Sequence, residues 1–199
     1  MKKKITTLAL VAALFAVTLA GATLAFFTDK DSKANVFTVG NVAITLTEPN
    51  WQQPAAVQPG VTYEKNPIVT NDGANNAWVR VNVTVTDAAA FKTAMTKHSI
   101  TQLEGIFAGY DTAKWDRAAI TEDTAKDTIT YSYYYNTVLA PTATTGALFT
   151  SVTLPAKFDN ADMTSLGADF TITVTADAIQ ADTFGNAADA FSAFDAQTP

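Results

Sequence analysis

The side chains that could support catalysis are few, because the chain contains one histidine and no cysteine. His98 follows residues 88–97, in which Phe91 and Met95 recur at helical spacing, so we expect it at the end of a helix. A cation is favourable there through the helix dipole, and one histidine with no partner apparent in the sequence is weak evidence for catalysis. The His-Glu-x-x-His sequence of zinc proteases is absent, and three-histidine and thiolate metal sites are excluded. The sequence therefore predicts no catalytic residue.

Aspartates are the other candidate metal ligands. Asp29 and Asp31 have the opening spacing of an EF-hand calcium loop, but the sixth position is Ala34 where glycine is needed, and the twelfth is Gly40 where a bidentate glutamate should lie. We therefore expect no metal site in this segment and no cofactor. A weak oxygen-ligand site elsewhere remains open.

Tyrosines cluster at Tyr131, Tyr133, Tyr134 and Tyr135. They could form a stacking platform for sugars. Packing within a strand is favoured, because tyrosine is a preferred strand residue and alternate rings face opposite sides of a sheet.

The elements that must position these residues are mostly strands. Alternation of apolar and polar residues predicts strands at residues 36–47, 61–70, 77–86, 128–139, 147–154 and 170–176. Helices are expected at residues 88–97, with Asp87 as the N-cap, and at about 187–194. Strands without regular strand-helix alternation favour a mainly β fold, an antiparallel sandwich with one or two short helices.

The first residues of the chain have the layout of an export signal. Three lysines precede an uncharged run over residues 5–25, with small residues at Thr23 and Ala25. This predicts a signal peptide over residues 1–25, cleaved between Ala25 and Phe26, and a single domain over residues 26–199. The alternative is a retained membrane anchor, which the alanine- and threonine-rich composition disfavours.

The expected exported part is acidic. Three of the 13 basic residues lie in the signal, which has no acidic residue, so 10 basic residues face 19 acidic ones. Such a surface repels nucleic acid, because phosphate contacts need clustered lysine and arginine. Without cysteine, stability must come from core packing or from association with other chains.

Several segments, in this order along the chain, resemble the TasA and camelysin family of secreted Gram-positive proteins. The junction Leu24-Ala25-Phe26-Phe27-Thr28-Asp29 is similar to the family's cleavage region, and Phe37-Thr38-Val39-Gly40-Asn41-Val42 to its first strand. The later segments are Asn66-Pro67-Ile68-Val69-Thr70-Asn71, Ala77-Trp78-Val79-Arg80-Val81, Tyr133-Tyr134-Tyr135-Asn136 and Ala178-Ile179-Gln180-Ala181-Asp182. The resemblance covers nearly the whole chain.

The resemblance implies a jelly-roll-like sandwich, exported with a signal peptidase of the SipW type, that self-assembles head to tail into extracellular biofilm-matrix fibres. An accessory matrix or anchor protein is a further implied partner. In such fibres the N-terminal segment of one subunit adds as a strand to the next, and here the donor would be residues 26–37. Its donor residues would be Phe26, Phe27, Thr28, Asp29, Val36 and Phe37. Strand addition to an unpaired edge is physically reasonable, and a head-to-tail contact that does not close makes a filament.

Three alternatives stay open. The donor segment could fold back as an edge strand of its own domain. The protein could be a camelysin-like secreted metalloprotease, which the residues support little. It could also be a cell-surface binding module for a host protein or a polysaccharide, with the tyrosines as contacts.

Overall fold

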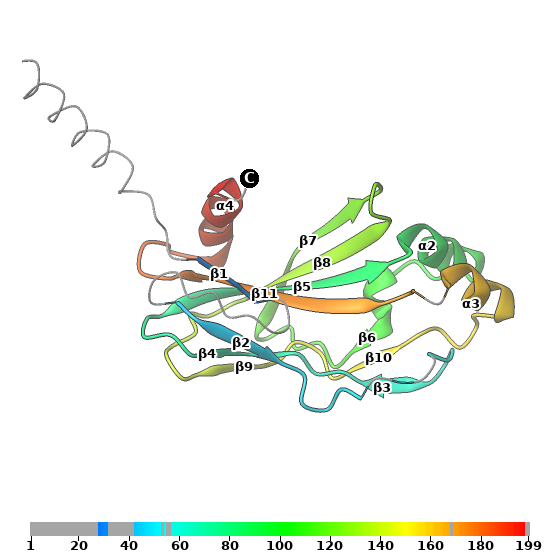
Figure 1. Cartoon of the computed structure of the whole chain (residues 1–199), viewed down its shortest axis with the longest axis horizontal. Coiled ribbons are helices and arrows are strands. Elements are labelled where there is room, and N and C mark those ends of the chain that lie inside the picture. Colours follow the sequence, from blue (N-terminus) through cyan, green and yellow to red (C-terminus); the bar gives the residue numbers. More distant parts are fainter. Residues whose placement is uncertain (1–27, 32–41, 53, 55–56, 168, 198–199) are drawn as a thin grey trace, which may run out of the picture.

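The computed structural model describes residues 28–31, 42–52, 54, 57–167 and 169–197, and its strands form two facing layers (Figure 1). The upper layer is one five-stranded antiparallel sheet, in the order β1 (Thr28–Asp31), β11 (Ile172–Gln180), β5 (Ala77–Thr86), β8 (Thr128–Tyr135) and β7 (Trp115–Asp123). The lower layer contains two three-stranded sheets. One is β3 (Thr62–Glu64), β10 (Ser151–Thr153) and β6 (Phe107–Ala108); the other is β2 (Ile44–Thr47), β4 (Ile68–Asn71) and β9 (Thr144–Ala147). The predicted mainly β, antiparallel sandwich is confirmed.

The core lies between the layers, and β5 is its central strand. Val79, Val81, Val83 and Val85 are fully buried, whereas the alternate residues of β5 are partly exposed. Side chains from the lower layer, including Val69 from β4, belong to the same apolar cluster. Apolar and polar residues alternate along β5 because one face of the strand packs against the opposite layer, as the sequence predicts.

The helices of the described residues are α2 (Ala88–Lys97), the 3-10 helix η1 (Leu103–Ile106), α3 (Asn160–Leu166) and α4 (Ala187–Gln197). α2 and α3 contact each other at one end of the sandwich, and α4 packs on β5, β8 and β11 at the other (Figure 1). The sequence predicts α2 and α4 but not α3, which is only seven residues long and has no apolar stripe. Within the described residues, no helix has the length and apolar character needed to span a membrane. The expected signal peptide lies outside those residues.

Asp87 takes the predicted N-cap position of α2, but its side chain does not cap the helix. Asp87 lies at φ 50° and makes no capping hydrogen bond with its side chain. Asp127, from the turn before β8, replaces it: its carbonyl accepts from Ala88 N–H (3.1 Å) and its Oδ1 from Ala89 N–H (2.9 Å). A residue distant in sequence therefore caps this helix.

Two predicted strands are each divided in two. The segment at 61–70 is β3 and β4, with Pro67 between them, and the segment at 147–154 contains the end of β9 and all of β10. At this corner Lys65 N–H donates to the Thr150 carbonyl (3.1 Å) and Leu148 N–H to the Pro67 carbonyl (3.0 Å). These two segments of the chain therefore pass side by side from one lower sheet to the other. Of the strand expected at 36–47, the described part begins at Val42, and β2 begins at Ile44.

Candidate functional site

The described part of the predicted donor segment is an edge strand. Thr28 and Asp29 are the first residues of β1, which pairs with β11 so that Thr28 lies opposite Ile179 and Asp31 opposite Ala176. In this structure, residues 28–31 therefore fold back on their own domain. The other predicted site residues, Ala25, Phe26, Phe27, Val36 and Phe37, lie outside the described residues.

β1 covers only half of the edge of β11. It pairs with residues 176–179, and among the described residues no strand pairs with 172–175 on that side. Thr86 N–H donates to the carbonyl of Thr171, the residue opposite it (3.1 Å). Every second residue of β11 from there on, such as Thr173 opposite Thr84, therefore directs its backbone groups toward β5. The backbone N–H and C=O groups of Ile172 and Val174 therefore point away from β5. Among the described residues these groups have no strand partner, and another strand could join them.

An apolar groove of about 320 Å³ lies beside this part of the β11 edge. β11 and the residues before it form one wall, and side chains of the lower layer form the other. The apolar residues of its lining are Val57, Val152, Leu154, Phe170, Ile172 and Val174. Main-chain hydrogen-bonding groups beside apolar side-chain pockets are the two features that recognise an extended peptide. We call this site the β11 groove.

A buried ion pair lies in the wall of the β11 groove. Lys65 is only 4 % exposed, and its Nζ lies 2.7 and 2.8 Å from the two carboxylate oxygens of Glu48. The same nitrogen lies 4.4 Å from the centre of the Trp51 ring. Because Glu48 neutralises the ammonium group, the pair adds no net charge to the groove. The sequence contains no signal for this pair, since its members lie on opposite sides of a proline-containing loop.

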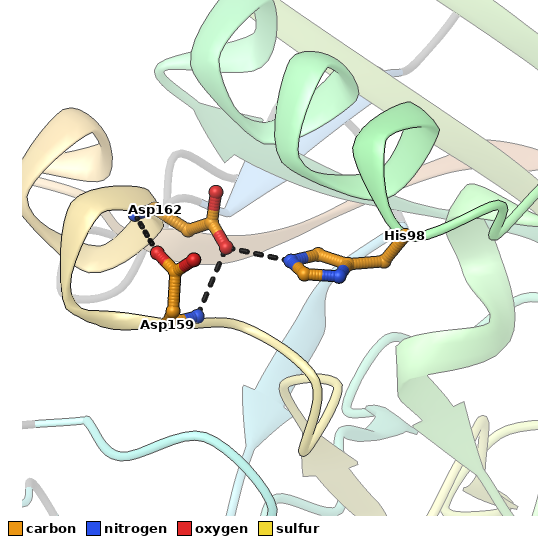
Figure 2. Close-up of side chains that lie close together, drawn as sticks. All are labelled: His98, Asp159 and Asp162. Carbon is orange, nitrogen blue, oxygen red and sulfur yellow. Dashed lines mark hydrogen bonds and ion pairs between the residues drawn. The ribbon is translucent and has the colours of Figure 1, made fainter.

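A second cluster joins α2 to α3 (Figure 2). His98, at the end of α2, lies 2.7 Å through Nε2 from Asp162 Oδ2, which also accepts from Asp159 N–H (2.9 Å). Asp159 Oδ1 accepts from the N–H groups of Ala161 and Asp162 (2.9 and 3.0 Å). Lys97 Nζ lies 2.7 Å from Asp159 Oδ2 and 2.9 Å from Asp162 Oδ1. All four carboxylate oxygens thus accept hydrogen bonds.

This cluster has the right residue types for a metal but not the right arrangement. His98, Asp159 and Asp162 offer three ligand atoms within 4.8 Å of one another. The backbone N–H of Asp159, with His98 and Lys97, holds the pKa of Asp162 well below its usual range, so this carboxylate is ionised and can only accept. His98 Nε2 therefore donates its proton to Asp162, and this nitrogen cannot bind a metal while that hydrogen bond is made. Lys97 already supplies the positive charge, so the arrangement fits an ionic clamp between two helices.

Acid should weaken this clamp. The pKa of Asp162 is lower in the folded state than in the unfolded state. Its contribution to folding stability is therefore complete above the unfolded-state pKa of about 3.9, and is lost as the pH falls toward the folded-state pKa. The melting temperature of the protein should therefore exceed that of Asp162→Asn at pH 7, and the difference should shrink below about pH 4. Thermal unfolding of both proteins between pH 7 and pH 2 measures this. A constant difference over that range would contradict the ionic clamp.

The tyrosine cluster packs within the protein. Tyr131 is fully buried and Tyr133 is 5 % exposed, while Tyr134, on the other face of β8, stacks on Phe191 of α4 with ring centres 5.3 Å apart. Tyr135 lies against Trp115 at 5.2 Å. The alternation favoured from the sequence is confirmed, and the cluster is not an exposed platform.

Comparison with known proteins identifies the family. The family model described as camelysin metallo-endopeptidase matches residues 1–99. The matched part runs from the N-terminus through β5 and α2, and ends before Asp159 and Asp162. No curated protein and no solved structure matches the chain with significance. The family model supports the resemblance carried by the sequence motifs, and the chain belongs to the TasA and camelysin family.

Proposed function

We propose that this protein is a secreted structural subunit that assembles head to tail into extracellular fibres. The observation that carries the proposal is the half-covered edge of β11, which has hydrogen-bonding groups directly beside an apolar groove. A strand from the preceding subunit, residues 26–37, would pair with this edge and place apolar side chains in the groove. The partner is thus a second copy of the same chain.

The donor segment has the residues that such a site requires. Phe26 and Phe27, and further along Val36 and Phe37, are apolar and separated by polar residues. Pairing would satisfy the backbone groups of Ile172 and Val174, which have no strand partner among the described residues. Donor and acceptor are different surfaces, so the contact is heterologous and extends without limit unless the rotation closes a ring.

Export would prepare the donor. Removal of residues 1–25 by a SipW-type peptidase would free the new N-terminus at Phe26, so cleavage would act as the switch for assembly. We place the fibres in the extracellular matrix or on the cell surface of a Gram-positive bacterium. An accessory matrix or anchor protein would attach them.

Deletion of residues 26–33 tests the proposal. We expect the shortened protein to form no fibres in negative-stain electron microscopy, because it has lost Phe26, Phe27 and most of the donor segment. It should remain folded by circular dichroism, because the deletion removes only a four-residue edge strand from the described fold. A version with extra residues before Phe26 is the matched control and should also remain monomeric. Unaltered fibres from the deletion variant would overturn the proposal.

The alternative is a secreted peptidase, and the family description is the observation that favours it. The His98 cluster gives it no geometric support. His98 Nε2 donates to Asp162, and Lys97 occupies the position where a cation would balance the two carboxylates. We therefore assign this cluster to stability rather than to catalysis.

A further inference from the structure

A second cavity, of about 350 Å³, lies between η1 and the β7–β8 pair. It shares no lining residue with the β11 groove. Its volume is at the small end of the range for ligand pockets, about 300–1,000 Å³. The residues that matter for its chemistry are Glu104, Phe107, Tyr110, Arg117, Tyr133 and Phe149.

Aromatic rings make most of its wall. Phe107 and Phe149 stack with ring centres 4.9 Å apart, and Tyr110 and Tyr133 lie 5.2 Å apart at an angle of 50°. Phe149 and Tyr133 are almost fully buried, which holds them in place. The rings that a ligand could reach are therefore the partly exposed Phe107 and Tyr110, which these buried rings hold in place.

The polar groups of the cavity include both donors and acceptors. Arg117 and Glu104 form an ion pair in which the side chains remain 51 % and 30 % exposed. The Tyr133 hydroxyl has no hydrogen-bond partner within the described part of the chain, whereas the Tyr110 hydroxyl is committed to the Trp115 carbonyl. A guanidinium group, a carboxylate and a phenol are thus grouped around one aromatic cavity.

The polar groups of the cavity limit the kind of ligand that it can bind. An anion would meet Glu104 and a cation would meet Arg117, so the two charges together favour a neutral molecule. A hydrocarbon ring would displace the water that hydrogen-bonds to these polar groups and would offer no hydrogen bond in its place. Burying the polar groups in that way is unfavourable. A pyranose ring has apolar C–H faces and a hydroxylated edge that both donates and accepts. We infer that this cavity binds one sugar ring, free or within a polysaccharide chain.

The inference goes beyond assembly and does not depend on it. Because the cavity and the β11 groove share no residue, a subunit could use both at once. A fibre of such subunits would carry one sugar site per subunit.

Saturation-transfer difference NMR tests the inference, because it detects weak ligands on monomers and fibres alike. The probes are the methyl glycosides of glucose, galactose and N-acetylglucosamine, each beside its tetrasaccharide. Tyr133→Phe keeps the buried ring and removes the hydroxyl, and Glu104→Gln removes the carboxylate charge. Tyr134→Phe is the matched control, since it makes the same change on the opposite face of β8.

We expect saturable binding of at least one glycoside, weakened roughly twofold to tenfold by each cavity variant and unchanged in the control. Tighter binding of the tetrasaccharide would identify a polysaccharide as the source, and equal binding would identify a free sugar. Absence of saturable binding for every probe would overturn the inference. So would binding that Tyr133→Phe and Glu104→Gln leave unchanged while both variants melt like the parent protein. Binding of an indole probe in place of every sugar would overturn it in favour of an aromatic ligand.

Discussion

Replacing Ile172 by proline should abolish fibre assembly and leave a folded subunit. Proline has no N–H group to offer an incoming strand, and its ring obstructs this edge of β11. The N–H of Ile172 points away from β5, so the pairing of β11 with β5 keeps all its hydrogen bonds. Ile172 is also the first residue of β11, a position that tolerates proline. Electron microscopy would measure assembly, and circular dichroism would measure folding.

Two further variants separate the possible causes of this loss. Ile172→Ala keeps the N–H group, so it should still assemble, weakened only by the loss of one apolar side chain from the lining of the β11 groove. Ala118→Pro places proline on β7, the opposite edge of the sheet, at the bulge where the register with β8 shifts. It should also assemble. Fibres from Ile172→Pro would show that β11 is not the acceptor, and loss of fibres in Ala118→Pro alone would move the acceptor to β7.

Replacing Arg80 by methionine should cause a large loss of stability. Arg80 Nε and Nη2 lie 3.0 and 2.8 Å from Asp177 Oδ2, and its Nη1 and Nη2 lie 2.8 Å from the carboxylate oxygens of Asp195 on α4. The guanidinium group also lies 4.7 Å from the centre of the Phe191 ring. Burial alone would lower the pKa of Arg80, but the hydrogen bonds and charges of Asp195 and Asp177 raise it above its usual value, so the group stays charged. One side chain thus joins β5, β11 and α4.

The expected loss of stability comes from Asp177, which stays buried after Arg80 is removed. Asp177 is 5 % exposed, and without Arg80 its charge would be buried with Asn82 Nδ2 (3.0 Å) as the one side-chain donor left among the side chains that the structure describes. Breaking a buried pair in this way costs about 3–5 kcal/mol, or a fall of roughly 6 °C or more in Tm for a chain of this size. Asp195→Asn should cost at most about 1 kcal/mol, because that side chain is 57 % exposed.

Thermal unfolding of the single variants and of Arg80→Met/Asp177→Asn measures the effect. The double variant should recover part of the loss, because it removes the unpaired charge. Equal melting temperatures for Arg80→Met and Asp195→Asn would contradict this account.

Secondary structure is predicted best from the sequence where one face of a strand or helix is buried. In β5 the alternating valines fix both the element and its orientation, and in β8 the tyrosine rings divide between two faces. β7 was missed because seven of its nine residues are exposed, so it has no apolar alternation to detect. Strand pairing with β8, rather than burial, holds it in the sheet.

The candidate sites were less predictable, because they depend on contacts between distant residues. His98 and Asp162 are 64 residues apart and meet only because α2 and α3 pack together. The β11 groove depends on where β1 ends on β11, which no local pattern encodes. The apolar residues of the N-terminal segment, by contrast, are a local property of the sequence and by themselves indicate a candidate donor.

If subunits assemble as proposed, the four residue pairs between β1 and β11 would also affect when a subunit can polymerise. A segment tethered to its own domain competes at an effective concentration that is about millimolar for a short flexible connection. In the proposed assembly, a donor segment must first leave the β11 of its own subunit, so its pairing with the next subunit must gain more contact than β1 does. The fold-back strand would therefore set a threshold concentration for growth. A subunit released singly would stay monomeric and diffuse, and would join a fibre only where secretion has made the protein concentrated.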